Sequence, residues 1–173
     1  MQMELLNDSI VKRRTLLWHM GERFAAQTLL SQGWTIINQN WKAGRYEIDI
    51  IALSPEQLLV FIEVKTRITS VHPGVSMYGL ESITHEKKQR LVAAASIYLH
   101  HNELVDRGAR LDVIVVSYPR KQNPQNQDPR NSPERPRRNP VDNQAEVLEG
   151  LDEDALRSKL DAPVVTHIYQ AFY

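Results

Sequence analysis

The sequence predicts a single α/β domain in which helices flank a central mixed β-sheet. Two observations predict this class: two segments carry apolar residues at helical spacing, and five stretches are rich in β-forming residues. Their order along the chain is α-β-β-β-α-β-β, with a segment of unusual composition before the last strand. A chain of 173 residues has room for one core of this kind and little room for a second.

The first half of the chain predicts a helix followed by three strands. Apolar residues recur at helical spacing over residues 9–31, and Gly33 follows where a helix C-terminus favours glycine. The expected strands are residues 34–40, 47–53 and 58–66. The connection over residues 54–57 is short, so the second and third strands should pair as an antiparallel hairpin.

The second half predicts one helix over residues 84–101, with Thr84 as its cap, and strands over residues 111–118 and 164–172. Residues 119–141 hold six of the nine prolines and six basic residues against two acids, whereas residues 142–161 hold seven acids. We therefore expect a domain of residues 1–118 plus 162–173, interrupted by a disordered or loosely ordered insert over 119–161. A surface helix is expected over residues 144–160 of that insert.

Composition excludes several classes of protein. The chain has no cysteine, so disulfides, cysteine-based zinc sites and a thiol nucleophile are excluded. No apolar run of membrane-spanning length or signal-peptide type is present, so we expect a cytoplasmic protein that does not enter the membrane. The formal net charge of zero conceals local basic and acidic segments and does not argue against a nucleic-acid partner.

Charged residues interrupt the second and third predicted strands. Alternate residues of a strand face the same side, so Glu47, Asp49 and Ile51 should share one face of the second strand. Glu63 and Lys65 should likewise share one face of the third strand. Pairing about the short turn would place Asp49 opposite a residue at or near Glu63. Burial of unpaired charge is costly, so this part of the sheet is the predicted site.

Two neighbouring carboxylates favour a cation between them. Mg²⁺ takes one or two carboxylates together with water and substrate phosphate, and it activates water for attack. Asp49 and Glu63 are therefore candidate catalytic residues and ligands for Mg²⁺ or Mn²⁺, and Lys65 would stabilise charge on phosphate. The simpler alternative is a common salt bridge between Glu63 and Lys65 at the end of a sheet, with Asp49 at the surface.

An acid on one strand followed, across a turn, by Glu63-Val64-Lys65 is the PD-(D/E)xK arrangement of restriction-type nucleases. The chain resembles the YraN-like family of predicted endonucleases, which is similar to archaeal Holliday-junction resolvases. The stretches that carry this resemblance include Gly21-Glu22, Glu47-Ile48-Asp49, Leu59–Arg67, Arg110–Val113 and His167-Ile168. The resemblance implies a restriction-endonuclease-like core, and by analogy with the resolvases it makes Glu22 a further metal ligand.

The leading hypothesis is a metal-dependent endonuclease acting on DNA, with branched or otherwise structured DNA as a candidate substrate. Glu47 would be an auxiliary acid in the site, and the expected phosphate contacts are Arg67, Lys87, Lys88 and Arg90. One alternative is a nucleic-acid-binding module that has the nuclease fold and no turnover. Another is an interaction protein that works through residues 119–161. A homodimer is compatible with each of these hypotheses.

Overall fold

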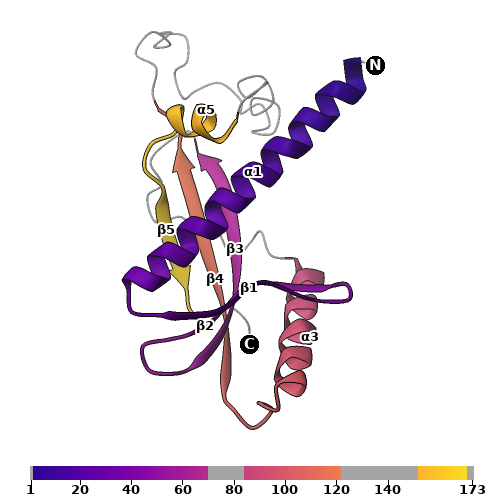
Figure 1. Ribbon diagram of the computed structural model, residues 1–173, viewed down its shortest axis with the longest axis vertical. Helices are drawn as coiled ribbons and strands as arrows, with labels where there is room; N and C mark the ends of the chain where they lie inside the picture. Colours follow the sequence, from indigo (N-terminus) through magenta and orange to yellow (C-terminus); the bar gives the residue numbers. More distant parts are fainter. Residues whose placement is uncertain (1, 70–83, 122–151, 171–173) are drawn as a thin grey trace, which may run out of the picture.

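The computed structural model describes residues 2–69, 84–121 and 152–170, and side chains from residue 11 onward. Within these ranges the chain forms a five-stranded mixed sheet in the order β1-β2-β3-β4-β5 (Figure 1). The elements in chain order are α1 (Gln2–Ser31), β1 (Thr35–Ala43), β2 (Tyr46–Leu53), β3 (Leu59–Thr69), α3 (His85–His101), β4 (Ala109–Pro119), α5 (Glu153–Ser158) and β5 (Val164–Ile168). The predicted α/β class and the order of the long elements are confirmed.

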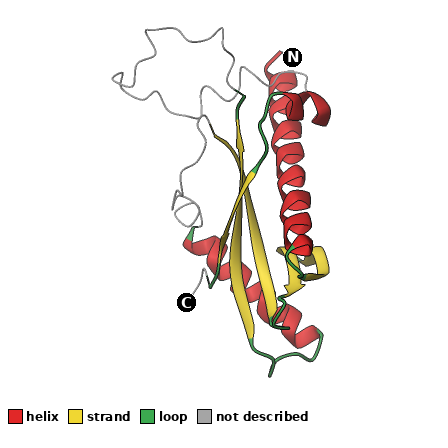
Figure 2. Ribbon diagram, turned by 90° about the vertical axis from the view of Figure 1, so that its left-hand side faces the viewer, coloured by secondary structure: helices red, strands yellow, loops and turns green. Residues whose placement is uncertain are grey.

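The two long helices cover opposite faces of the sheet, as Figure 2 shows. The α1 face has the larger core, and its buried members include Met20, Leu29, Ile50, Ile62, Val64, Ile114 and Val116. The α3 face joins Ala94 and Tyr98 of the helix to Ile51, Leu59 and Phe61 of the sheet. Burial on both faces explains why β3 and β4 are apolar almost throughout their central parts.

Strand pairing agrees with the predicted hairpin. β2 and β3 pair antiparallel from Leu53↔Leu59 to Ile50↔Ile62, around the turn in which Gln57 N–H donates to the Ser54 carbonyl oxygen at 2.8 Å. β3 and β4 run parallel along their whole length, joined through α3. β5 pairs antiparallel with β4, so the last predicted strand belongs to the same sheet, although it ends at Ile168.

Local signals mark the helix ends as expected. Gly33 follows α1 with a φ of +83°, a left-handed conformation that glycine adopts without steric cost. Thr84 caps α3, because its side chain accepts a hydrogen bond from the Lys87 backbone N–H. These two residues separate the helices from their neighbouring segments.

The expected alternation of β2 is wrong at Asp49. Ile48 and Ile51 both pack on the α3 face, with Ile50 between them on the α1 face, so strict alternation breaks between positions 48 and 51. Glu47, Asp49 and Ile51 therefore do not share one regular face. The break lies in the part of β2 that precedes Ile50, which is not paired with β3. There the Asp49 side chain bonds to the β3 backbone instead.

The described ends of the predicted insert belong to the domain. Leu156 and Leu160 are buried against the α1 face, and Arg120 bridges to Leu160. Arg23 of α1 also pairs with Glu153 of α5. These contacts attach the described parts of residues 119–161, at the two ends of the predicted insert, to the α1 face of the domain. The prediction of disorder for residues 122–151 lies outside the described residues.

No helix in the described part of the chain combines the length and the apolar character needed to cross a membrane.

Candidate active site

A cleft of about 470 Å³ opens where β2 separates from β3. The antiparallel pairing of β2 with β3 stops at Ile50↔Ile62. The next residues, Asp49 on β2 and Glu63 on β3, therefore lie on either side of an opening and do not continue the ladder. Residues from four elements line the cleft: Arg14, Leu17, Trp18, Glu47, Asp49, Glu63, Val64, Lys65, Thr66, Arg67, Ile68 and Lys87. The structure thus brings Asp49, Glu63 and Lys65 together in one place.

Asp49 is buried, with 3% of its surface exposed. Its Oδ2 accepts a hydrogen bond of 2.7 Å from the Val64 backbone N–H, the group that would otherwise be unpaired where β2 departs. Burial, together with the neighbouring charge of Glu63, raises the pKa of Asp49 to about 7. The single backbone hydrogen bond offsets only part of that effect.

Glu63 is equally buried, and each of its carboxylate oxygens has a lysine beside it. Lys65 Nζ donates to Oε1 at 2.7 Å, and Lys87 Nζ lies 3.1 Å from Oε2. The salt bridge of the simpler alternative therefore exists. The Glu63–Lys65 salt bridge is not, however, a common surface pair, because only 3% of the Glu63 side chain is accessible.

Two further acids approach from α1 and from the start of β2. Glu22 is 3% exposed, and its Oε1 has no hydrogen-bond partner. Burial raises the pKa of Glu22, and hydrogen bonds with Asn40 and His19 oppose that rise incompletely. Glu47 lines the cleft beside Asp49, and its Oε1 lies 3.3 Å from Lys42 Nζ.

These acids influence one another electrostatically. The charge of Glu22 raises the pKa of Asp49, and the charge of Glu47 raises that of Glu22. Within the described ranges no three acidic or histidine side chains already lie close enough to enclose a metal ion. A cation here would therefore have to be held by one or two carboxylates and water, as Mg²⁺ commonly is.

Sequence reasoning missed two residues of this site, Trp18 and Asn40, and it considered Arg14 only as an extension of a phosphate-binding rim with Arg13 and Arg67. Arg14 and Trp18 line the cleft, and with Glu22 they repeat every fourth residue, so helical spacing could have found them. Asn40 lies opposite the Asp49 region in β1 with a left-handed φ of 51°, and its side chain bonds to Glu22. Asparagine tolerates this conformation better than most residues, and no sequence pattern indicated the contact.

The predicted phosphate contacts divide into two groups. Arg67 and Lys87 line the cleft, where Arg67 Nε donates to Ser117 Oγ at 3.0 Å. Lys88 and Arg90 are not among the described residues that form its walls. Trp41 packs edge-on against Tyr98 with ring centroids 5.3 Å apart, so it contributes to the α3 core.

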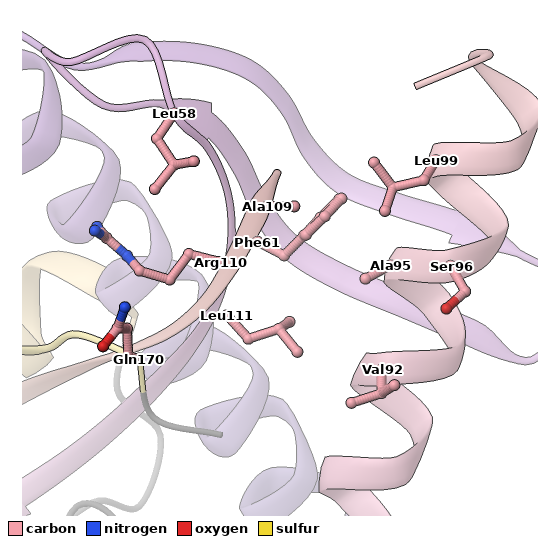
Figure 3. Close-up of a pocket in the computed structure, with 10 residues that line it drawn as sticks. All are labelled: Leu58, Phe61, Val92, Ala95, Ser96, Leu99, Ala109, Arg110, Leu111 and Gln170. Atoms are coloured by element: carbon pink, nitrogen blue, oxygen red, sulfur yellow. The ribbon is translucent and has the colours of Figure 1, made fainter. Parts of the chain in front are cut away.

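A second pocket of about 360 Å³ lies between α3 and the sheet, away from these acids. Figure 3 shows its lining, with Leu58, Phe61, Leu99 and Leu111 among the apolar side chains and Arg110 at one side. No carboxylate lines this pocket in the part of the chain that the structure describes. This pocket is therefore not an alternative to the cleft as a metal-binding active site.

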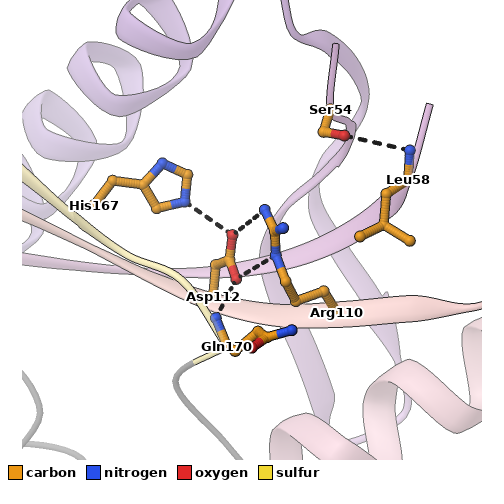
Figure 4. Close-up of polar contacts among 6 residues, drawn as sticks. All are labelled: Ser54, Leu58, Arg110, Asp112, His167 and Gln170. Atoms are coloured by element: carbon orange, nitrogen blue, oxygen red, sulfur yellow. Dashed lines mark hydrogen bonds and ion pairs between the residues drawn. The ribbon is translucent and has the colours of Figure 1, made fainter. Parts of the chain in front are cut away.

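A separate buried acid, Asp112 on β4, lies in register with Ile62 of β3 and holds the end of β5 to β4 (Figure 4). It accepts hydrogen bonds from Arg110, from His167 at 2.9 Å and from the Gln170 backbone N–H at 2.9 Å. Burial disfavours its charge, but these hydrogen bonds outweigh burial and lower the pKa of Asp112. We interpret it as a structural clasp for the last strand.

Comparison with known proteins agrees with the resemblance noted in the sequence. A family model described as "Uncharacterised protein family UPF0102" matches residues 21–116, a range that contains Glu22, Asp49, Glu63, Lys65 and Lys87. A UPF0102 protein of Bifidobacterium longum subsp. infantis is 38% identical over 99 residues, covering 56% of this chain and 77% of the relative. One from Synechococcus sp. is 38% identical over 108 residues, covering 60% and 79%. The chain therefore belongs to the uncharacterised protein family UPF0102.

Proposed function

We propose that this protein is a metal-dependent endonuclease that cleaves phosphodiester bonds in DNA. The observation that carries the proposal is the pair of buried carboxylates, Asp49 and Glu63, that face one cleft from adjacent strands with Lys65 beside them. A fold that has no catalytic use for this cleft would gain stability by replacing such acids with apolar residues. Retaining them at the break in the sheet favours a chemical role.

The donor set is suited to Mg²⁺ or Mn²⁺. Asp49 and Glu63 offer oxygen ligands, which hard divalent cations prefer, and Glu22 holds a buried oxygen with no hydrogen-bond partner. The raised pKa of Asp49 means that the protein compensates its charge incompletely, and a bound cation would favour the charged form. When bound, the metal would supply an activated water and neutralise charge on the phosphate.

The other residues of the cleft would bind and orient the substrate. Lys65 is the group suited to stabilise negative charge that develops on the phosphate, since it already bonds to a carboxylate of the site. Arg14 and Arg67 line the same cleft and would hold the flanking phosphates. Branched or otherwise structured DNA remains the proposed substrate through the resolvase analogy.

One observation favours the rival proposal of a binding module without turnover. Lys65 and Lys87 already neutralise Glu63, so the folded protein does not need a metal to balance that charge. In that case the cleft would bind phosphate through its basic side chains alone.

A metal-by-substrate panel separates the two proposals. Purified protein would be incubated with duplex, single-stranded and four-way-junction DNA in Mg²⁺, Mn²⁺ or EDTA. We expect cleavage only with metal, and loss of cleavage in Asp49→Asn and Glu63→Gln, which preserve side-chain size. Binding without cleavage in every metal would select the module.

A further inference from the structure

The two lysines on Glu63 are not equivalent. Lys65 lies two residues away on the same strand, and its ammonium makes a short hydrogen bond of 2.7 Å to Oε1. Lys87 comes from the first turn of α3, and its ammonium is 3.1 Å from Oε2 without hydrogen-bond geometry, since Oε2 has no hydrogen-bond partner. Oε2 is shielded from solvent and has the Lys87 ammonium as its charged neighbour, so a cation that binds Oε2 has to displace Lys87.

A divalent cation on Glu63 would meet both ammonium groups. Charges of the same sign a few Å apart repel strongly inside a partly buried cleft. The two lysine side chains are about equally exposed, at 32% and 35%. Lys65 is held by a hydrogen bond of 2.7 Å from the same strand, whereas Lys87 is carried on a separate helix and makes only an ion pair. Lys87 is therefore the group that can move away.

We propose that Lys87 is an exchangeable counter-ion of Glu63, which a divalent cation displaces and which then binds a phosphate of the nucleic acid. This inference rests on the proposed function, because it takes Asp49 and Glu63 as the ligands of the cation. It extends the role that the sequence predicts for Lys87, which is a phosphate contact together with Arg67, Lys88 and Arg90.

The backbone around Lys87 allows a clean substitution. Its N–H bonds to the Thr84 side chain and supports the helix cap, and that bond does not depend on the lysine side chain. Lys87→Met keeps the length of the side chain and removes its charge. Lys87→Arg keeps the charge, and Lys88→Met removes a neighbouring charge that does not line the cleft.

The test is calorimetric titration of the full chain with Mn²⁺ alone. We expect Lys87→Met to bind Mn²⁺ roughly tenfold more tightly than wild type, because one competing positive charge is gone. Lys87→Arg and Lys88→Met should bind it as wild type does. Wild-type affinity in Lys87→Met would overturn the inference while leaving the endonuclease proposal intact if cleavage by wild type still requires metal.

The affinity for junction DNA tests whether Lys87 binds phosphate after a cation has displaced it from Glu63. With Ca²⁺ as a metal that supports binding, Lys87→Met should bind junction DNA several-fold more weakly than wild type, whereas in EDTA the two should bind equally, since Lys87 is then held by Glu63. An equal loss of DNA affinity with and without Ca²⁺ would show a constant phosphate contact and overturn the exchange. Absence of Mn²⁺ binding in wild type and every variant would overturn both this inference and the metal-dependent function.

Discussion

Buried acids in this protein fall into two kinds, according to how well their charge is compensated. Asp112 receives hydrogen bonds from two side chains and one backbone N–H, and its pKa is lowered. Asp49 receives a single backbone hydrogen bond, and Glu22 keeps one oxygen unpaired, so both have raised pKa values. A compensated acid stabilises the fold, whereas an undercompensated acid costs stability and points to a ligand. The degree of charge compensation therefore distinguishes Asp112, which holds β5 to β4, from Asp49 and Glu22, the acids of the candidate site.

At the level of single residues, Lys65 should act on the transition state and not on metal binding. We expect Lys65→Gln to lower kcat by roughly 10²-fold or more, the scale seen when a charge-stabilising donor is removed. Mn²⁺ affinity should not fall, because the substitution removes a positive charge beside Glu63. Single-turnover cleavage and calorimetry measure the two effects separately.

Arg67 provides the matched control for Lys65. It lies two residues further along β3 and lines the same cleft, but it bonds to Ser117 and not to an acid of the site. Arg67→Gln should raise KM and leave kcat within a few-fold of wild type. Equal losses of kcat in the two variants would mean that Lys65 has no special role.

At the level of elements, the sequence allowed β3 to be predicted well and β2 only in part. In β3, apolar residues fill both faces up to Ile62, and Glu63 and Lys65 then alternate with buried Val64, so the local pattern fixes which side chains meet. In β2 the alternation fails at Asp49, because strand separation lets its side chain bond to the Val64 N–H. A bond between residues 15 apart is a tertiary feature that a period-two pattern does not contain.

The same limit explains the residues that sequence reasoning placed less well. Lys87 looked like one member of a basic helix face, and its contact with Glu63 follows only from how α3 packs on the sheet. A surface helix is predicted over residues 144–160, with Leu156 and Leu160 at helical spacing, but these two leucines complete the core on the α1 face. Composition describes a segment on average and does not reveal which of its side chains find a core.

The packing of α1 on β3 yields a prediction at this scale. Gly21 touches β3 so closely that a Cβ added there would lie 1.8 Å from Thr66 Oγ1 and 2.8 Å from Thr66 Cβ. Gly21→Ala must therefore displace the helix, and we expect a loss of about 1–3 kcal/mol in the free energy of unfolding. Since Glu22 is the next residue, Mn²⁺ affinity should also fall.

A double-mutant cycle tests the cause of that loss. Thr66→Ala removes the two nearest atoms, Oγ1 and Cγ2, so the combined variant should recover part of the stability lost in Gly21→Ala. Denaturant unfolding of the four proteins measures the coupling. Strictly additive losses would show that the helix and strand do not meet at this point.

At the level of the whole molecule, Asp112 and Asp49 make stability depend on pH in opposite directions. The pKa of Asp112 is lowered from 3.8, so its contribution is present above that value and is lost as pH falls through its folded pKa. The pKa of Asp49 is raised from 3.8 to about 7, so the folded protein holds a proton that the unfolded chain releases. Its contribution is present below about pH 4 and is lost as pH rises towards 7.

The raised pKa of Asp49 should therefore make the metal-free protein less stable at pH 8 than at pH 5. In EDTA at pH 8, we expect Asp49→Asn to unfold with a free energy higher than wild type by on the order of 2 kcal/mol, because asparagine keeps the acceptor for Val64 N–H and carries no charge. At pH 4 the two proteins should differ little, since Asp49 is then protonated. Asp112→Asn serves as the control with the opposite sign, because it should be less stable than wild type at pH 8.

At pH 8, addition of Mn²⁺ should make wild type more stable than Asp49→Asn. Wild type would gain stability from a ligand that binds only the folded state, whereas Asp49→Asn, which lacks a charged ligand, would gain little. Urea unfolding at the two pH values, with EDTA and with Mn²⁺, measures all four differences. If Asp49→Asn is destabilised in EDTA at pH 8 as strongly as Asp112→Asn, then Asp49 is a structural acid like Asp112, and the distinction between clasp and cleft does not hold.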